Sequence, residues 1–167
     1  MSLNNDSAVC ENVWQKMTPS LVKEVSEFWS FNKMLRPDSN VEERARQVVF
    51  IVRSNRDKNI VGLATVVEVT FKQLNGNNFY LFRSIILPAF RQQGLATKLI
   101  VETRDFLEFI STKDIHSQCI GMLVFVENPK LKQFKRETVW PASKMTFFGV
   151  DKEGRHIRVF YFRGARI

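Results

Sequence analysis

The spacing of apolar and polar positions in the N-terminal part of the chain predicts two helices. Thr18-Pro19 opens the first, because threonine caps a helix N-terminus and proline suits the first helical position. Apolar side chains then recur at a helical repeat, on one face: Leu21, Val25, Phe28 and Trp29. The run Ser39-Asn40-Val41-Glu42 has the form of a capping box, so a short second helix is expected to continue to about Gln47.

Runs of β-branched and aromatic residues predict strands on both sides of these helices. The expected strands are 8–17, before the first helix, and then 48–53, 60–71 and 78–87. Asn75-Gly76 is a strong hairpin signal between the last two of them. The three central strands are therefore expected to be antiparallel neighbours.

Helical periodicity returns in the second half of the chain, over about 95–111. A buried strand is expected at 119–126, and Asn128-Pro129 begins another short helix that reaches about residue 136. Two strands, 145–150 and 155–162, form a closing hairpin. The order β-α-α-β-β-β-α-β-α-β-β is typical of a mixed α/β (α+β) domain.

Composition indicates a single folded domain over residues 1–167, with residues 1–8 expected to be flexible. Hydrophobic residues make up 44% and charged residues 25%, which excludes an intrinsically disordered chain. No apolar run is long enough to span a membrane, and the first residues do not read as a signal peptide. The two cysteines are too few for a disulfide framework, so a reducing cytoplasm is the expected compartment.

The net charge of +8 predicts attraction to polyanions. Nucleic acid, an acidic partner and a phosphate-rich small molecule all fit, and so does a soluble surface that is merely basic. Charge alone does not decide among these four. Two histidines and two cysteines, far apart along the chain, predict no metal site.

The segment that carries candidate chemistry is a strand, a loop with one glycine and a helix, around Gly94. A helix N-terminus offers unpaired N–H groups and a positive dipole end, so phosphate oxygens fit there. Gly94 would let a ligand approach the backbone, and Arg91 would add positive charge at the rim. This pattern predicts a diphosphate site. A glycine that only makes a turn is the alternative.

The run Arg91-Gln92-Gln93-Gly94-Leu95-Ala96 resembles the acyl-CoA-binding signature R/Q-x-x-G-x-G/A of the GNAT superfamily of N-acetyltransferases. Asn128, after the next strand, resembles the family's following motif, in which an asparagine approaches the pantetheine arm. The order of elements also resembles the family, so the likeness covers essentially the whole chain. It implies a mixed, mostly antiparallel, twisted sheet of about seven strands flanked by about four helices.

The resemblance implies acetyl-CoA, or another acyl-CoA, as cosubstrate. Its diphosphate would lie on backbone N–H groups, its pantetheine along the preceding strand, and a splay beside strand 119–126 would admit the arm. The implied cofactor-binding residues are Ile85, Ile86, Leu87, Arg91, Gln92, Gln93, Gly94, Leu95, Ala96, Thr97 and Asn128. Further lysines could meet the phosphates or simply form solvated helix faces: Lys98, Lys130, Lys132 and Lys135.

The candidates for catalysis are Glu68, Ser84 and Tyr80, because the strand before the signature holds no carboxylate. Glu68 would act as a base through water, and a backbone N–H near Leu87 would polarise the thioester carbonyl. Cys119 could form an acyl-cysteine, but the residue fits a buried structural thiol better.

The chain departs from the family where a tyrosine usually serves as general acid, since Phe134 and Lys135 stand there. Tyr161 could replace it only if the last strand curls toward the site. Despite this departure, the resemblance as a whole favours an N-acetyltransferase that works by direct attack in a ternary complex.

Two alternatives stay open: a catalytically silent CoA-binding domain of the same fold, and a basic nucleic-acid-binding domain. The acceptor would be an amine of a small molecule or a protein. Trp29, Phe31 and Met34 hint at an aromatic acceptor wall. No membrane partner is expected, nucleic acid is the least favoured partner, and a homodimer through the last strand is left open.

Overall fold

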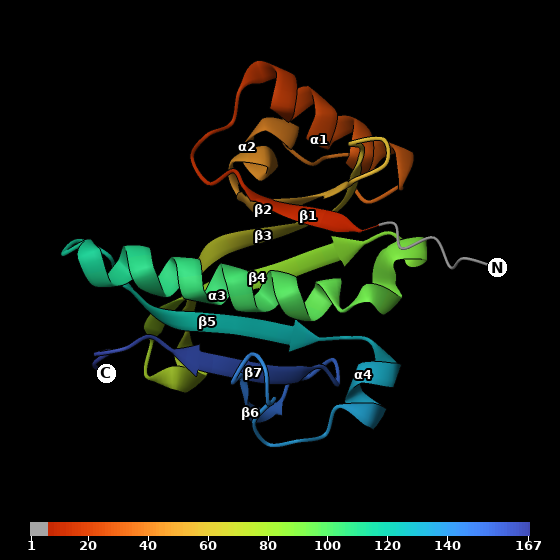
Figure 1. The fold of residues 1–167 in the computed structure, drawn as a ribbon. Coiled ribbons are helices and arrows are strands. Elements are labelled where there is room, and N and C mark those ends of the chain that lie inside the picture. The colour runs from red at the N-terminus through yellow and green to blue at the C-terminus, as the bar shows by residue number, and fades with distance from the viewer. Residues whose placement is uncertain (1–6) are drawn as a thin grey trace. The chain divides into compact units, whose positions relative to one another are not determined.

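In the computed structural model, residues 7–167 are described, except for the side chains of residues 92 and 93. The strands are β1 Ala8–Asn12, β2 Val48–Ser54, β3 Ile60–Phe71, β4 Asn77–Ile86, β5 Cys119–Val126, β6 Thr146–Val150 and β7 His156–Tyr161. The helices are α1 Pro19–Phe31, α2 Val41–Arg46, α3 Leu95–Lys113 and α4 Pro129–Phe134, with the 3₁₀ turns η1 Lys72–Leu74 and η2 Pro88–Gln93. The predicted order of strands and α-helices is confirmed (Figure 1).

The seven strands of the described chain form one sheet in the order β1-β2-β3-β4-β5-β7-β6. The pairs β1–β2, β2–β3, β5–β7 and β6–β7 are antiparallel, and β4–β5 is parallel. The predicted mixed, mostly antiparallel α/β sheet is thus confirmed. Because β7 lies between β5 and β6, the last strand has no open edge, and the idea that it pairs across a dimer is wrong.

The chain divides into two compact units. Unit 1 holds the described residues of Met1–Thr65 together with Ser84–Leu99, and unit 2 holds Val66–Arg83 together with Ile100–Ile167. In neither unit does the described chain include a helix with the length and apolarity that a membrane crossing requires.

The first strand of unit 1 is shorter than predicted. Ala8 is its first residue, although 1–8 are expected to be flexible; residues 1–6 lie outside the described part of the chain. The strand ends at Asn12, well before the predicted end. The Oδ1 atom of Asn12 accepts a hydrogen bond from the Trp14 N–H at 3.2 Å, and this local bond replaces the strand ladder.

The helix caps of unit 1 confirm one prediction and correct another. Thr18 caps α1 by accepting from the Leu21 N–H, as predicted. In α2 the cap is Asn40 rather than Ser39, and Asn40 Oδ1 accepts from the Glu43 N–H at 3.2 Å. Asparagine caps as well as serine does, and either cap places an acidic residue at the third helical position, Glu42 for Ser39 and Glu43 for Asn40.

The hairpin between β3 and β4 forms where Asn75-Gly76 predicts it. Both residues adopt positive φ, 59° and 67°, which asparagine and glycine tolerate best. The connection is longer than a two-residue turn because η1 precedes it.

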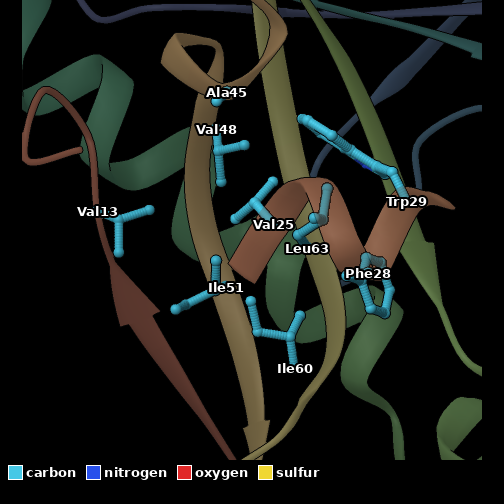
Figure 2. Packing of buried hydrophobic residues seen from close by; sticks show 9 residues of the cluster. All are labelled: Val13, Val25, Phe28, Trp29, Ala45, Val48, Ile51, Ile60 and Leu63. Atoms are coloured by element: carbon cyan, nitrogen blue, oxygen red, sulfur yellow. The ribbon is translucent and has the colours of Figure 1, made fainter. Parts of the chain in front are cut away.

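The core of unit 1 forms where α1 and α2 pack against β2 and β3 (Figure 2). The predicted stripe of α1 is confirmed, since Val25, Phe28 and Trp29 are buried and Leu21 packs against them. They meet apolar residues from the strands, from α2 and from the segment after β1: Val13, Ala45, Val48, Ile51, Ile60 and Leu63. Burial of these side chains is the main force that holds the helices on the sheet.

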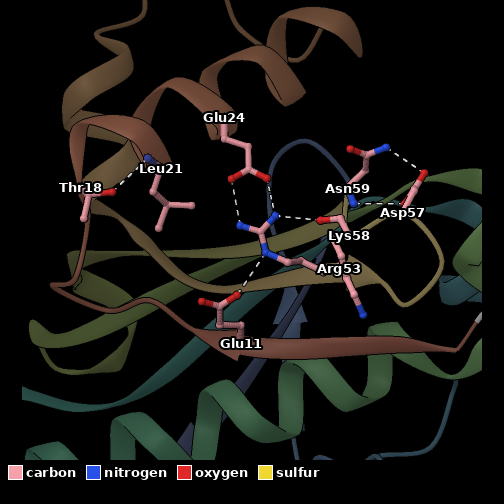
Figure 3. Close-up of polar contacts among 8 residues, drawn as sticks. All are labelled: Glu11, Thr18, Leu21, Glu24, Arg53, Asp57, Lys58 and Asn59. Carbon is pink, nitrogen blue, oxygen red and sulfur yellow. Dashed lines mark hydrogen bonds and ion pairs between the residues drawn. The ribbon is translucent and has the colours of Figure 1, made fainter.

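A polar network on unit 1 centres on Arg53 of β2 (Figure 3). Its guanidinium binds both carboxylate oxygens of Glu24 in α1, with 2.9 Å between Nη2 and Oε2. It also donates to Glu11 of β1 at 3.2 Å and to the Lys58 carbonyl at 2.9 Å. Arg53 therefore joins two strands, a helix and a turn. Its hydrogen bonds to Glu24, together with its charge, hold the pKa of Glu24 below its usual range.

Unit 2 contains an arginine of a different kind, Arg158 of β7, which is only 1% exposed. Its guanidinium donates to the carbonyls of Lys135 (3.0 Å), Met145 (3.2 Å) and Thr138 (3.4 Å). It also lies 4.2 Å from the centroid of the Trp140 ring. Burial lowers the pKa of Arg158. The arginine therefore fixes the segment between α4 and β6 through its backbone.

Substitution of Glu24 tests the Arg53 network. Because its pKa is lowered in the folded state, the Glu24 carboxylate stabilises the fold at neutral pH, and this contribution is lost as the pH falls below about 4.3. We expect Glu24→Gln to cost about 1 kcal/mol at pH 7, since solvent screens a side chain that is 39% exposed.

Urea unfolding of both proteins between pH 7 and pH 3 measures this difference. It should shrink toward zero at the acid end. Glu27→Gln on the same helix is the control, because Glu27 is exposed and its ion pair with exposed Lys23 is long, at 3.9 Å. Equal losses from the two substitutions would contradict the role assigned to Glu24.

Candidate functional site

The candidate site begins at the C-terminal end of β4, in unit 1. A glycine of the neighbouring strand, Gly62, allows a close approach there, since a Cβ on it would lie 2.8 Å from the Ile85 carbonyl oxygen. Sequence reasoning missed Gly62. A lone glycine inside a β-branched strand is the signal that could have found it.

Both polar groups of the Leu87 backbone, just after β4, form hydrogen bonds within unit 1. Its N–H donates to the Val61 carbonyl at 2.8 Å, and its carbonyl accepts from the Phe90 N–H at 2.9 Å. The prediction that this N–H polarises a thioester carbonyl is therefore wrong for Leu87 itself. The same two bonds anchor the start of η2.

Arg91 ties the end of η2 to the strand. Its Nε donates to the carbonyl of Ile86 at 2.9 Å. One of its donors thus holds the loop rather than a ligand, while the residue as a whole stays exposed. The side chains of Gln92 and Gln93, both predicted to take part in the site, lie outside the described part of the chain.

Gly94 makes the turn from η2 into α3, with a φ of +70°. Its carbonyl accepts from the Lys98 N–H at 3.0 Å, which closes the first turn of the helix. The N–H groups of the range 95–97 come before that first bond, so the helix itself leaves them unpaired. No atom outside the turn lies within 4 Å of a Cβ built on Gly94. The backbone is thus open to a ligand where the sequence predicts a diphosphate.

The first residues of α3 differ in burial. Leu95 is buried in the core, while Ala96 and Thr97 are exposed. On β4, Ser84 is exposed and Ile86 is buried. The structure therefore brings the predicted cofactor-binding residues of unit 1 into one continuous stretch of strand, turn and helix.

Two of the predicted catalytic residues, Glu68 and Tyr80, lie in unit 2. Tyr80 is buried, its ring centroid is 6.3 Å from that of Phe162, and burial raises the pKa of its hydroxyl. Glu68 is exposed on β3, and its negative charge contributes to the raised pKa of Tyr80 and of Cys119.

Cys119, at the start of β5, is buried, and burial together with the Glu68 charge raises the pKa of its thiol to about 12. A nucleophilic cysteine needs a lowered pKa, because the thiolate is the reactive form. The surroundings of Cys119 are those of a structural thiol.

The other candidates of unit 2 lie after β5 and in β7. Asn128 is exposed and caps α4, since its Oδ1 accepts from the Lys130 N–H at 2.9 Å. Phe134, close to where the family carries a tyrosine, is 71% exposed, and Tyr161 of β7 is 46% exposed. Among the described residues, no group of three or more His, Cys, Asp and Glu side chains could hold a metal ion.

The expected aromatic acceptor wall is only partly supported in unit 1. Trp29 belongs to the core, and the Arg44 guanidinium lies 5.5 Å from the centroid of its ring. Met34 packs against the same core. Phe31, at the end of α1, is 88% exposed, and Met34 is half-buried.

Solved structures with the same fold include several with bound acetyl-CoA. The structure "AtaTR bound with AcCoA" matches with a TM-score of 0.58 and 14% identity over 95% of each chain. Arabidopsis thaliana NAA60 in complex with acetyl-CoA matches with a TM-score of 0.59 and 13% identity, over 93% of this chain and 99% of that one. AtaT complexed with acetyl-methionyl-tRNAfMet matches with a TM-score of 0.56 and 15% identity, over 93% and 95%. At these identities the likeness concerns the fold.

The sequence itself identifies the family. A search of curated proteins found no match. Residues 14–109, more than half of the chain, match the profile of the acetyltransferase (GNAT) family. This range includes the strand, the Gly94 turn and most of α3. The chain therefore belongs to the GNAT acetyltransferase family and is an acyltransferase.

Proposed function

We propose that the protein is an N-acetyltransferase that uses acetyl-CoA as cosubstrate and an amine as acceptor. The observation that carries this proposal is the turn at Gly94, with its left-handed backbone, open space and unpaired N–H groups at the start of α3. Such a helix N-terminus suits a diphosphate. The family match and the acetyl-CoA in related structures support the choice of ligand.

The cosubstrate would bind mainly to backbone groups of unit 1. The diphosphate would accept hydrogen bonds from N–H groups of the range 92–97. The pantetheine would pair with the backbone of Ile85 and Ile86, although the Ile86 carbonyl already accepts from Arg91, just as the Leu87 N–H already donates to Val61. Asn128 and the predicted splay beside β5 remain part of the proposal.

Acetyl transfer would follow direct attack. The acceptor nitrogen bonds to the thioester carbon, the carbon–sulfur bond breaks, the CoA thiolate leaves, and the ammonium proton passes to a base. We propose Glu68 as that base, through water, because it is an exposed carboxylate. Ser84 is exposed and able to hydrogen-bond a substrate, whereas Tyr80 is buried and receives no proton-transfer role.

A silent CoA-binding domain is the second candidate, favoured by the phenylalanine and lysine at the family's tyrosine position. Release of CoA thiol with a panel of amines separates the two. The acceptor class stays open at this point. The solved structure of AtaT complexed with acetyl-methionyl-tRNAfMet adds an RNA-linked amine to the small-molecule and protein amines of our proposal.

Substitution of Gly94 by alanine tests the cofactor site. A side chain at a φ of +70° costs about 1 kcal/mol and disturbs the N–H groups that face the diphosphate. Gly154→Ala is a matched control, because Gly154 in unit 2 has a φ of +77° and equally open surroundings.

Calorimetric titration with acetyl-CoA measures the effect. We expect both variants to lose similar stability, while only Gly94→Ala binds acetyl-CoA roughly 10-fold more weakly. Unchanged affinity in Gly94→Ala, or equal losses in both variants, would mean that this turn does not hold the cosubstrate.

Direct attack predicts that the enzyme never carries the acetyl group on Cys119. With a thiol pKa of about 12, the thiolate is scarce at neutral pH. Intact-mass spectrometry after incubation with acetyl-CoA should show no acetylated protein in the wild type or in Cys10→Ala. An acetyl adduct on the wild type that disappears in Cys119→Ala would establish a covalent route instead.

A further inference from the structure

Seven consecutive residues at α4 carry four positive charges and no negative one: Lys130, Leu131, Lys132, Gln133, Phe134, Lys135 and Arg136. We call this segment the α4 surface. Lys130, Lys135 and Arg136 are exposed, whereas Lys132 is half-buried and donates to the Gly154 carbonyl at 3.0 Å. Three cations therefore face solvent within one short stretch.

The charge of the α4 surface is not neutralised within unit 2. In the part of the chain that the structure describes, no ion pair joins Lys130, Lys135 or Arg136 to a carboxylate. The acidic residue just before α4, Glu127, pairs with Arg155 at 3.5 Å. A surface of this kind attracts a polyanion, and a nucleic acid releases its condensed counterions when cations neutralise its phosphates.

The backbone that carries these charges is held in place. The carbonyl of Lys135 accepts from Arg158 Nη2 and from Trp140 Nε1, each at 3.0 Å. The N–H of Lys135 donates to the Leu131 carbonyl at 2.9 Å. Arg158 is buried, so the clamp lies beneath the surface and leaves the cations exposed. Little backbone entropy would be lost when a ligand binds.

Two apolar side chains stand among the cations. Phe134 is 71% exposed and Leu131 is 41% exposed. An aromatic ring beside positive charges is the arrangement on which unpaired bases stack while the phosphates are neutralised. An acidic peptide would use the charges and leave the ring without a partner.

We propose that the α4 surface binds single-stranded nucleic acid, with Lys130, Lys135 and Arg136 on the phosphates and Phe134 against a base. The inference does not depend on the proposed diphosphate site at the Gly94 turn, which is built from residues of unit 1. It reassigns to nucleic acid two lysines, Lys130 and Lys135, that the resemblance associates with the phosphates of CoA.

Fluorescence anisotropy with labelled 20-nucleotide oligo-U and oligo-dT, over a series of salt concentrations, tests the proposal. The variant K130Q/K135Q/R136Q should bind at least about 10-fold more weakly. A plot of log association constant against log salt concentration should have a slope that is less negative by about 2. K16Q/K72Q/R166Q removes the same charge from exposed positions elsewhere and should change the slope by less than one. Stronger binding of one oligonucleotide identifies the preferred nucleic acid.

Phe134→Ala separates stacking from charge. It should weaken binding about 5-fold without changing the salt slope, because it removes no phosphate contact. Equal losses in the two triple variants, or no binding of either oligonucleotide at low salt, would overturn the proposal.

Two further ligands keep the test specific. Polyglutamate of similar length should bind far more weakly than the oligonucleotides, and equal binding would mean an acidic protein partner instead. In K130Q/K135Q/R136Q, acetyl-CoA affinity, measured by calorimetry, should fall far less than the affinity for oligo-U. A loss as large as that for oligo-U would assign the α4 surface to the coenzyme and overturn the proposal.

Discussion

The left-handed backbone of Gly94 is the constraint on which the candidate site depends. Gly94, with a φ of +70°, turns the chain at the end of η2, so that α3 can start at the next residue. The first turn of α3 then exposes unpaired N–H groups, and the missing side chain leaves the space before them open. Two hydrogen bonds fix the segment before this turn, one from Arg91 to the Ile86 carbonyl and one from the Leu87 N–H to the Val61 carbonyl. Recognition of a phosphate group here would thus come from backbone geometry rather than from particular charged side chains.

Each unit also relies on one arginine, and the two arginines work differently. Arg53 in unit 1 is partly exposed and bonds two carboxylates, so its contribution depends on pH and salt. Arg158 in unit 2 is buried and bonds three backbone carbonyls and an aromatic ring. Its charge never meets a carboxylate at bonding distance among the described residues, so the segment it holds is fixed by directed hydrogen bonds. That segment includes the end of the α4 surface.

Much of the fold follows from local sequence signals, and the differences have local causes. Thr18-Pro19, Asn75-Gly76 and Asn128-Pro129 each begin or turn the element they predict, because capping and positive φ depend on neighbouring residues alone. The sequence pattern predicts the cap of α2 one residue too early, because Ser39 and Asn40 are both good caps. The candidate site combines local and long-range features. The Gly94 turn is visible in the sequence, whereas the engaged N–H of Leu87, the close approach at Gly62 and the burial of Arg158 arise from contacts between distant segments.

Amide hydrogen exchange at the start of α3 tests most directly that this backbone holds the cosubstrate. With saturating acetyl-CoA, the amides of Leu95, Ala96 and Thr97 should exchange at least about 10-fold more slowly, and ATP at the same concentration should protect them much less. Hydrogen bonds from these amides to a diphosphate produce that pattern, because they replace bonds to water. Unchanged exchange at all three amides with acetyl-CoA bound would contradict the proposed site and place the cosubstrate elsewhere on the protein.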